Sequence, residues 1–272
     1  MIPVTEMRGK QVAEKSMDLS KYLDFATELG YRAGKITLGY FNAGVRPEFK
    51  PDDTPVTAAD RAAETFIRGE IEKAYPGHAI VGEEYGEKAG EGATFRWLVD
   101  PIDGTKSFVH GVPMYGVLIG LEIEGAVRVG AAYYPGTDEM LCAAQDAGCW
   151  WNGRRARVSE VASLKRACVC FTTPHGFADH ARLEAWDRIQ RAAYMVRGWS
   201  DCYGYLLVAT GRAEAMLDPV MKVWDCGPFP VILGEAGGFF GSWAGEPGHL
   251  HGEALSANPH ILPELLRLIK EG

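Results

Sequence analysis

The sequence predicts a layered fold of the mixed α+β and α/β class, with an antiparallel sheet in the first half and a mixed sheet in the second. Two long segments near the start have apolar residues at helical spacing. A series of short β-rich segments separated by turn residues follows them. Beyond about residue 158, strand-like and helix-like segments alternate, as they do in α/β packing. We therefore expect two subdomains, residues 1–157 and residues 158–272.

The chain begins with two predicted helices. Residues 1–17 have no clear pattern, whereas the apolar positions of residues 18–41 recur at helical spacing and predict a long amphipathic helix. A second helix is expected to begin at Thr57, because Thr57 and Asp60 have the spacing of a capping box. This helix should end at Pro76, since proline and the glycine after it interrupt helices.

Predicted strands occupy the middle of the chain. The apolar run 95–99 indicates a buried strand, and Pro101 should end it because proline has no N–H to donate. Glu124-Gly125 is a hairpin signal between two β-rich runs. These segments predict an antiparallel meander flanked by the two helices. The other strands expected in this half cover residues 79–81, 115–121, 126–134, 139–144 and 149–151.

The second half mixes strands and helices. Its alternation of the two predicts a mixed or parallel sheet. The final helix has Asn258 as its expected N-cap. Strands are expected at residues 167–171 and 213–217, and helices at residues 179–194, 202–210, 225–234 and 259–270.

Composition limits the class of protein. The formal net charge of −8 argues against a surface for nucleic acid or an anionic membrane, since both need clustered Lys and Arg. The six cysteines form no C-x-x-C pair and lie in apolar runs, so we expect reduced core thiols rather than disulfides or zinc ligands. Neither a signal peptide nor a run of about 20 apolar residues is visible, and the expected location is the cytoplasm.

Two carboxylates and a hydroxyl gather where the predicted strand 95–99 ends. Asp100 stands at the strand end, and Asp103 follows three residues later. Gly104 and Thr105 then turn the chain and offer backbone N–H groups to an anion. Carboxylate and carbonyl oxygens are the ligands that Mg²⁺ prefers, and Mg²⁺ commonly accompanies phosphate. The alternative is an Asp-Pro turn followed by an Asp-Gly turn, without a site.

Three further acids can each be explained by an ordinary structural role. Glu83 follows the predicted strand 79–81 and is either a site residue or a solvated loop acid. Asp225 follows the apolar pair Val223-Trp224 and is expected to be a helix N-cap, a role that is compatible with being a site residue as well. Asp60, taken alone, is a first-turn acid that complements the helix dipole.

Together these motifs resemble the inositol monophosphatase superfamily of metal-dependent phosphatases. The resemblance extends from the first predicted helix to Gly238, which is most of the chain. It implies the layered fold of that superfamily and hydrolysis of a phosphate monoester with two or three Mg²⁺ ions and no covalent intermediate. The motifs that carry it are Gly82-Glu83-Glu84, then Asp100-Pro101-Ile102-Asp103-Gly104-Thr105, then Trp224-Asp225 with Glu235-Ala236-Gly237-Gly238.

The resemblance also implies a role for each site residue. The first subdomain would supply most metal ligands, and the second would supply one ligand and the residues that determine specificity. One Mg²⁺ would be bound by Glu83, Asp100 and the carbonyl of Ile102, and another by Asp100, Asp103 and Asp225. Thr105 would polarise the attacking water, and Asp60 would pair with Thr105. Glu83 would contact the metal ions that bind this water. The backbone N–H groups of Gly104 and Thr105 would hold the phosphate.

Asp201 and Asp218 bear on the leaving group. Inositol phosphatases tend to have a small uncharged residue at the first position and Glu at the second. Two aspartates that face the alcohol half suit a cationic leaving group with an amine and an imidazole. Residues 201–205 and 213–219, together with Ser107, resemble the histidinol-phosphate phosphatase branch. The expected substrate is therefore histidinol phosphate, and the pathway is histidine biosynthesis. One departure from the family pattern is Cys226-Gly227-Pro228-Phe229, which leaves the local substrate wall in doubt.

Other functions stay open at this point. An inositol-1-phosphate or broad sugar-phosphate phosphatase is the main alternative, and a 3′-phosphoadenosine-type nucleotidase fits less well. A catalytically silent metal-binding scaffold is a third class of function. Because the superfamily is commonly homodimeric, we expect a homodimer, with Trp150, Trp151 and Trp199 as candidate interface residues.

Overall fold

The structure, a computed structural model, describes residues 17–44, 46–51, 55–92, 94–199 and 201–271. The pattern-free residues 1–16 lie outside that range. The helices are α1 (Ser20–Leu38), α2 (Ala58–Ala74), α3 (Thr105–Val109), α4 (Pro174–Asp179), α5 (Leu183–Ala192), α6 (Cys202–Ala209), α7 (Val223–Cys226), α8 (Phe229–Glu235) and α9 (Leu262–Lys270). The first large sheet contains, in spatial order, β10 (Arg154–Arg155), β9 (Gly148–Trp151), β8 (Glu139–Ala144), β7 (Ala126–Tyr134), β6 (Gly116–Ile123), β5 (Phe95–Asp103), β3 (Ala79–Gly82) and β4 (Gly86–Lys88). The second contains β12 (Met195–Arg197), β11 (Cys168–Phe171), β13 (Ala215–Asp218), β15 (Ala254–Ala257) and β14 (Phe239–Gly241), and β1 (Glu48–Phe49) pairs with β2 (Pro55–Val56).

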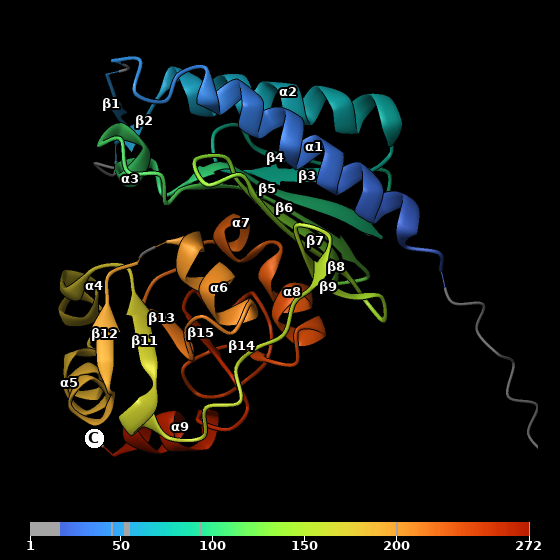
Figure 1. The fold of residues 1–272 in the computed structure, drawn as a ribbon. Helices are drawn as coiled ribbons and strands as arrows, with labels where there is room; N and C mark the ends of the chain where they lie inside the picture. Colours follow the sequence, from blue (N-terminus) through green and yellow to red (C-terminus); the bar gives the residue numbers. More distant parts are fainter. Residues whose placement is uncertain (1–16, 45, 52–54, 93, 200, 272) are drawn as a thin grey trace, which may run out of the picture.

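These elements stack in five alternating layers of helix and sheet (Figure 1). Helices α1 and α2 cover one face of the first sheet, where their apolar residues join one core cluster. Helices α6, α7 and α8 lie between the two sheets and share a second cluster with both. Helices α4, α5 and α9 cover the outer face of the second sheet. The predicted layered α and β architecture is confirmed.

The two sheets have the predicted character, with one exception. Strands β5 to β10 form an antiparallel meander, and Glu124 and Gly125 both have positive φ in the hairpin turn between β6 and β7. Strand β3, however, pairs with β5 in parallel, because β4, antiparallel to β3 on its other side, returns the chain to the end of the sheet where β3 began. The second sheet is mixed, since β12, β11 and β13 are parallel and β15 and β14 pair antiparallel.

The N-terminal helices begin and end close to their predicted positions. Helix α1 buries Tyr22, Ala26 and Leu29 along one face, as its apolar spacing requires. Helix α2 has the predicted capping box, in which the Thr57 side chain accepts from a backbone N–H and Asp60 accepts from the Thr57 N–H.

Several boundaries in the second half were predicted wrongly. Residues 179–194 form no single helix, because α4 ends at Asp179, α5 begins at Leu183, and β12 follows. The predicted helix 225–234 is split into α7 and α8 at Gly227-Pro228. Strands β12, β14 and β15 were not predicted at all. Asn258 is not the N-cap of the final helix, because α9 begins at Leu262 and its N-cap is Ile261. Asn258 Oδ1 instead accepts the N–H groups of His260 and Ile261, in the turn before α9.

Pro101 does not end its strand, contrary to the prediction. Strand β5 continues to Asp103, because Pro101 and Ile102 form a bulge opposite the single residue Val117 of β6. A bulge leaves a residue out of the ladder, which is where a strand tolerates proline. The bulge also places Asp100 and Asp103 on the same short curved segment.

Two paired glycines let the middle helices approach the first sheet. Gly120 of β6 lies opposite Gly130 of β7. A Cβ at Gly120 would collide with the carbonyl oxygen of Gly227, and a Cβ at Gly130 would collide with the backbone of Pro228. The turn between α7 and α8 therefore packs directly on the sheet backbone.

His78 lies in an aromatic stack beneath α1 and α2. Its ring stacks on Phe95 at 4.4 Å and on Tyr75 at 4.8 Å between centroids. The indole N–H of Trp97 donates to His78 Nδ1 at 3.0 Å, which requires Nδ1 to be unprotonated. Burial lowers the pKa of His78, with a smaller contribution from the charge of Lys21.

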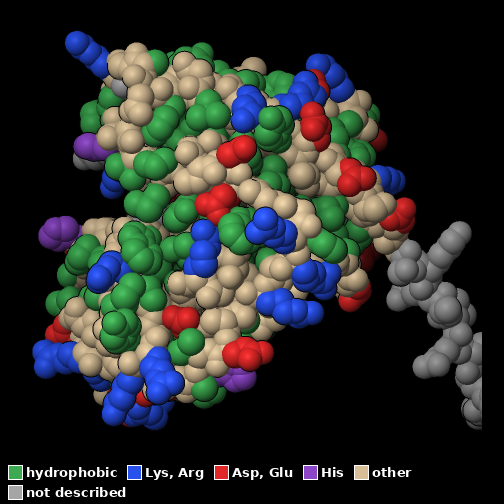
Figure 2. Space-filling view, in the orientation of Figure 1, with side chains coloured by type: hydrophobic (Ala, Val, Ile, Leu, Met, Phe, Trp, Pro, Cys, Tyr) green, Lys and Arg blue, Asp and Glu red, His purple; other side chains and the backbone are tan. Residues whose placement is uncertain are grey.

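The cysteines are free thiols, and the surface carries charges of both signs (Figure 2). All six cysteines are described and have free thiols, and five of them are buried, as predicted. On the face drawn in Figure 2, acidic and basic side chains are interspersed among neutral ones. Within the described residues, no helix combines the length and the apolar character needed to span a bilayer.

We expect Gly120→Ala to destabilise the protein by about 1–3 kcal/mol, the usual effect of overpacking, because the new methyl group meets the backbone at Gly227. Gly69→Ala is the matched control. Gly69 lies within α2 with no atom within 4 Å of its added Cβ, so alanine should stabilise the helix by up to about 1 kcal/mol. Thermal or urea unfolding measures both, and equal effects of the two substitutions would contradict the close approach.

Between pH 7.5 and pH 5.5, protonation of the buried pocket acids raises the melting temperature, whereas protonation of His78 lowers it. We therefore expect the melting temperature of His78→Gln at pH 5.5, relative to pH 7.5, to be higher than that of the wild type. The folded-state pKa of His78 is lowered, so the unfolded chain takes up the proton first. Its stabilisation is complete above the unfolded pKa of about 6.5 and is lost as pH falls through the folded-state pKa. Glutamine keeps an acceptor for Trp97 but does not titrate. Parallel pH dependences in the wild type and the variant would rule out this contribution.

Candidate active site

A pocket of about 180 Å³ opens where the two sheets and the middle helices meet. Six acidic side chains line it, and no Lys, Arg or His is among the described residues that do. Nine of the ten predicted site residues lie in this lining, and Asp60 lies directly behind it. The lining consists of Glu83, Asp100, Ile102, Asp103, Gly104, Thr105, Thr172, Thr173, Gly176, Asp201, Tyr205, Asp218, Pro219, Val220, Met221 and Asp225.

The bulged end of β5 presents the central carboxylates. Asp100 Oδ1 accepts the N–H of Ile102 at 3.0 Å, which fixes the carboxylate across the bulge. Asp103 Oδ1 accepts the N–H of Cys202 at 3.3 Å, from the first turn of α6. Gly104 follows with φ of 87°, a left-handed conformation that glycine adopts without strain and that starts α3 at Thr105.

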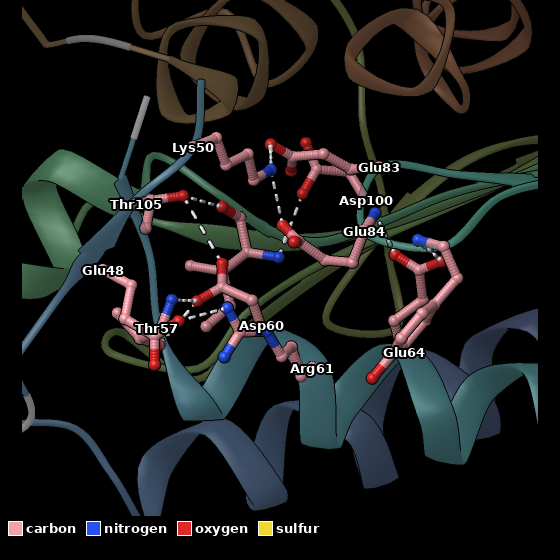
Figure 3. Close-up of polar contacts among 12 residues, drawn as sticks. Glu48, Lys50, Thr57, Asp60, Arg61, Glu64, Glu83, Glu84, Asp100 and Thr105 are labelled. Carbon is pink, nitrogen blue, oxygen red and sulfur yellow. Dashed lines mark hydrogen bonds and ion pairs between the residues drawn. The ribbon is translucent and has the colours of Figure 1, made fainter. Parts of the chain in front are cut away.

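Asp60 and Thr105 meet behind the pocket (Figure 3). Asp60 Oδ2 accepts from Thr57 N at 2.7 Å, while Thr105 Oγ1 lies 3.5 Å from Asp60 Oδ1 and 3.0 Å from the Ile102 carbonyl. Both interpretations of Asp60 are therefore compatible with the geometry, because its two oxygens face the helix cap and Thr105 respectively. Burial raises the pKa of Asp60 to about 6, although the hydrogen bonds from Thr57 oppose this.

Glu83 is held in place by Lys50 and, through the two residues that follow it, by Glu64 (Figure 3). Lys50 Nζ lies 2.8 Å from both Glu83 Oε1 and Glu84 Oε1. The fully buried Glu64 of α2 accepts the N–H groups of Glu84 and Tyr85, at 2.7 and 3.2 Å. Glu83 is thus not a freely solvated loop acid. Glu64, which fastens this turn to α2, was not predicted, because an acid within a helical pattern looks like a surface residue.

Asp225 reaches the pocket from the second half of the chain. It is not the N-cap of a helix; it occupies the first turn of α7, and its Oδ2 accepts the N–H of Lys222 at 2.7 Å. Burial, opposed by that hydrogen bond and reinforced by Glu83, raises the pKa of Asp225 to about 7.

The negative charges of these acids repel one another. Burial, followed by the charge of Glu83, raises the pKa of Asp100 well above its usual range. Burial, followed by the charge of Asp201, does the same to Asp103. Each of Asp100, Asp103 and Asp225 uses one oxygen for a backbone N–H, and among the described residues no hydrogen bond reaches the other oxygen. A site of this kind needs cations to keep its carboxylates ionised.

The donor set fits hard divalent cations. Carboxylate oxygens and the Ile102 carbonyl are the ligand types of Mg²⁺, and the six carboxylates outnumber the one soft ligand of the described lining, the Met221 thioether. Within the described part of the chain, no three His, Cys, Asp or Glu side chains converge closely enough to count as a finished metal site. The side chains would therefore have to draw together around an ion.

Asp201 and Asp218 line the same pocket from its other side. Asp201 precedes α6 with φ of 54° and ψ of −149°, a conformation that a residue with a side chain rarely adopts. Asp218 ends β13, and the Tyr205 hydroxyl donates to its Oδ2 at 2.7 Å. Burial raises the pKa of Asp218 to about 7.

The pocket also contains residues that the sequence analysis did not single out. Thr172 follows β11 directly, so the rule that placed Asp100 at a strand end could have identified it as well. Tyr205 lay within the predicted buried helix, where nothing distinguishes an aromatic core residue from one that binds a carboxylate. The others are Thr173, Gly176, Pro219, Val220 and Met221.

Comparisons with known proteins agree with this geometry. A model of the inositol monophosphatase family matches residues 18–271. A histidinol-phosphatase of Chlorobaculum parvum is 43% identical, covering 92% of this chain and 97% of its own length, and one of Streptomyces coelicolor is 35% identical over 92% and 98%. The crystal structure of the extragenic suppressor protein suhB from Bartonella henselae has a TM-score of 0.87 at 29% identity, covering 93% of this chain and 99% of that one.

The sequence motifs, the five-layered fold and the similarity over nearly the whole chain all agree. The chain therefore belongs to the inositol monophosphatase family of phosphatases.

Proposed function

We propose that this phosphatase hydrolyses histidinol phosphate with the help of Mg²⁺. The observation that carries the proposal is the pocket itself. Among the described residues, six carboxylates line it and no basic side chain does. A phosphate dianion cannot enter such a pocket unless cations accompany it. An organic ammonium group, in contrast, finds acidic partners there at once.

The carboxylates would divide into two groups. Glu83, Asp100 and the Ile102 carbonyl would hold one Mg²⁺, and Asp100, Asp103 and Asp225 would hold a second. When bound, the ions supply Lewis-acid stabilisation of phosphoryl charge and a more acidic water molecule. Asp100 would belong to both groups; it directly precedes the bulge, and Ile102 and Asp103 follow it on the same strand.

Residues of the chain would place the water and the phosphate. The Thr105 hydroxyl lies 3.0 Å from the Ile102 carbonyl and 3.5 Å from Asp60 Oδ1. With the carbonyl bound to Mg²⁺, the hydroxyl would donate its one proton to Asp60 and accept from the attacking water. The backbone N–H groups of Gly104 and Thr105 would bind phosphate oxygens at the start of α3. Water adds to phosphorus, the ester oxygen leaves as the alcohol after taking a proton, and no residue is covalently modified.

Asp201 and Asp218 would bind the alcohol half of the substrate. Histidinol carries an amine that is protonated at neutral pH, which suits two carboxylates better than a neutral polyol does. The similarity to histidinol-phosphatases is higher than that to an inositol-1-monophosphatase of Mesorhizobium japonicum, which is 33% identical over 79% of this chain. That relative supports a neutral inositol or sugar phosphate as the second candidate substrate.

Three broader proposals accompany this function: a place in histidine biosynthesis, a cytoplasmic location and a homodimer. For the dimer, Trp150 is the best of the predicted interface residues, since 38% of it is exposed. Trp151 instead donates to Glu139 and lies beneath Arg212, and Trp199 packs against the core between the sheets.

We expect Asp100→Asn to lower kcat/KM by at least about 100-fold, beyond the usual effect of losing a residue that only supports a metal ligand. In EDTA the variant should melt above the wild type, because one of several repelling buried carboxylates is gone. Mg²⁺ should raise the melting temperature of the wild type far more than that of the variant. Near-normal turnover by Asp100→Asn would exclude the proposed ligand set.

We expect Asp201→Asn to raise KM for histidinol phosphate more than KM for inositol-1-phosphate. Asparagine preserves the size of the side chain and tolerates positive φ, so the charge is the main change. Loss of one charge-assisted contact predicts a roughly 10-fold change in selectivity. Steady-state kinetics with both esters measures it, and an equal change for the two would remove the case for cation recognition.

A further inference from the structure

We propose that Thr172 is a positioning residue that holds Asp201 and Asp218 together as one subsite for a cationic leaving group. This inference rests on the proposed function and adds a residue to it. Thr172 lies at the end of β11, the strand between β12 and β13, and it lines the pocket beside both acids. Its hydroxyl accepts from the backbone N–H of Asp201, and it follows β11 beside the end of β13, where Asp218 lies.

The first contact leaves the hydroxyl proton of Thr172 unused. The N–H of Asp201 donates to Thr172 Oγ1 at 3.1 Å, so the oxygen is an acceptor in that direction. Phe171 of β11 pairs in parallel with Leu217 of β13, so Thr172 and Asp218 follow side by side at the ends of the two strands. A hydroxyl has one proton, and since the Asp201 contact does not use it, that proton is available to Asp218.

The neighbourhood of Thr172 also affects the charge of Asp218. The carboxylate accepts from the Tyr205 hydroxyl at 2.7 Å, and Thr172 opposes the rise that burial causes in the pKa of Asp218. The pKa is nevertheless raised to about 7, so an approaching ammonium group would complete the ionisation of Asp218. These donors reduce the amount of stabilisation that the ammonium group has to supply.

The first contact also holds Asp201 in place. Its φ of 54° and ψ of −149° are nearly confined to glycine, and surrounding contacts must hold a residue with a side chain there. The Thr172 hydroxyl supplies one such contact, and Cys202, the next residue, is tied to Asp103 through its own N–H. Thr172 therefore fixes the position of Asp201 relative to Asp218, which sets the spacing of the two charges.

The test compares Thr172→Val, which keeps the shape but removes the hydroxyl, with Thr172→Ser, which keeps the hydroxyl. Steady-state kinetics with Mg²⁺ would give kcat and KM for histidinol phosphate and for inositol-1-phosphate. We expect valine to raise KM for histidinol phosphate by about 10-fold or more, as for lost hydrogen bonds to a charged group. Its effect on kcat should be smaller, the KM for the neutral ester should not rise, and serine should restore the wild-type ratio.

Thr210→Val is the matched control, since its hydroxyl bonds the backbone at the far end of α6. It should leave the ratio of the two KM values unchanged, and the melting temperatures of all variants show whether they fold. Equal effects of Thr172→Val on both esters, or none on either, would overturn the inference while the proposed function stands. A wild-type enzyme that does not prefer histidinol phosphate would overturn the proposed function and the inference together.

Discussion

The structure depends on holding several carboxylates at one buried point against their mutual repulsion. Asp100 and Asp103 are surrounded by protein and by other acids, and both effects raise their pKa well above the usual range. Backbone N–H groups of Ile102 and Cys202 hold one oxygen of each in place. Without cations, the repulsion between these carboxylates lowers the stability of the folded protein; bound cations remove that repulsion. Binding sites in general reduce the stability of the unliganded protein for this kind of reason.

That gathering requires the two halves of the chain to meet closely. Asp100 and Asp103 come from the first sheet, whereas Asp225 comes from α7, beyond the second sheet's first strands. The glycines at positions 120 and 130 leave the room for the turn after α7 to contact the sheet backbone. A side chain at either position would push Asp225 away from its partners. The packing of the core at Gly120 and Gly130 thus determines where Asp225 lies in the site. A mutation remote from the pocket can therefore change the chemistry of the pocket.

Local signals predicted local structure well. The capping box at Thr57 and the turn at Glu124 were predicted correctly, because neighbouring residues determine them. Pro101 was misread since its tolerance depends on a bulge opposite β6, which only the partner strand creates. Acids after predicted strands identified the pocket from the sequence, and the same rule applied to hydroxyl residues would have included Thr172. Glu64 could not be identified, because its role depends on the backbone N–H groups of Glu84 and Tyr85, which are distant in the sequence.

The acids of the pocket can be separated by the donors that hold them. Asp100 accepts one backbone N–H in the described chain, so burial and repulsion leave its charge dependent on an added cation. Asp218 accepts from the Tyr205 hydroxyl, and Thr172 beside it also opposes the rise in its pKa, so protein donors take over part of that task. Its pKa is still about 7, so a cation must complete the ionisation, and an organic ammonium group can do this as well as a metal ion. In the proposed function, the same pocket would therefore hold inorganic cations at one set of carboxylates and bind the leaving group at another.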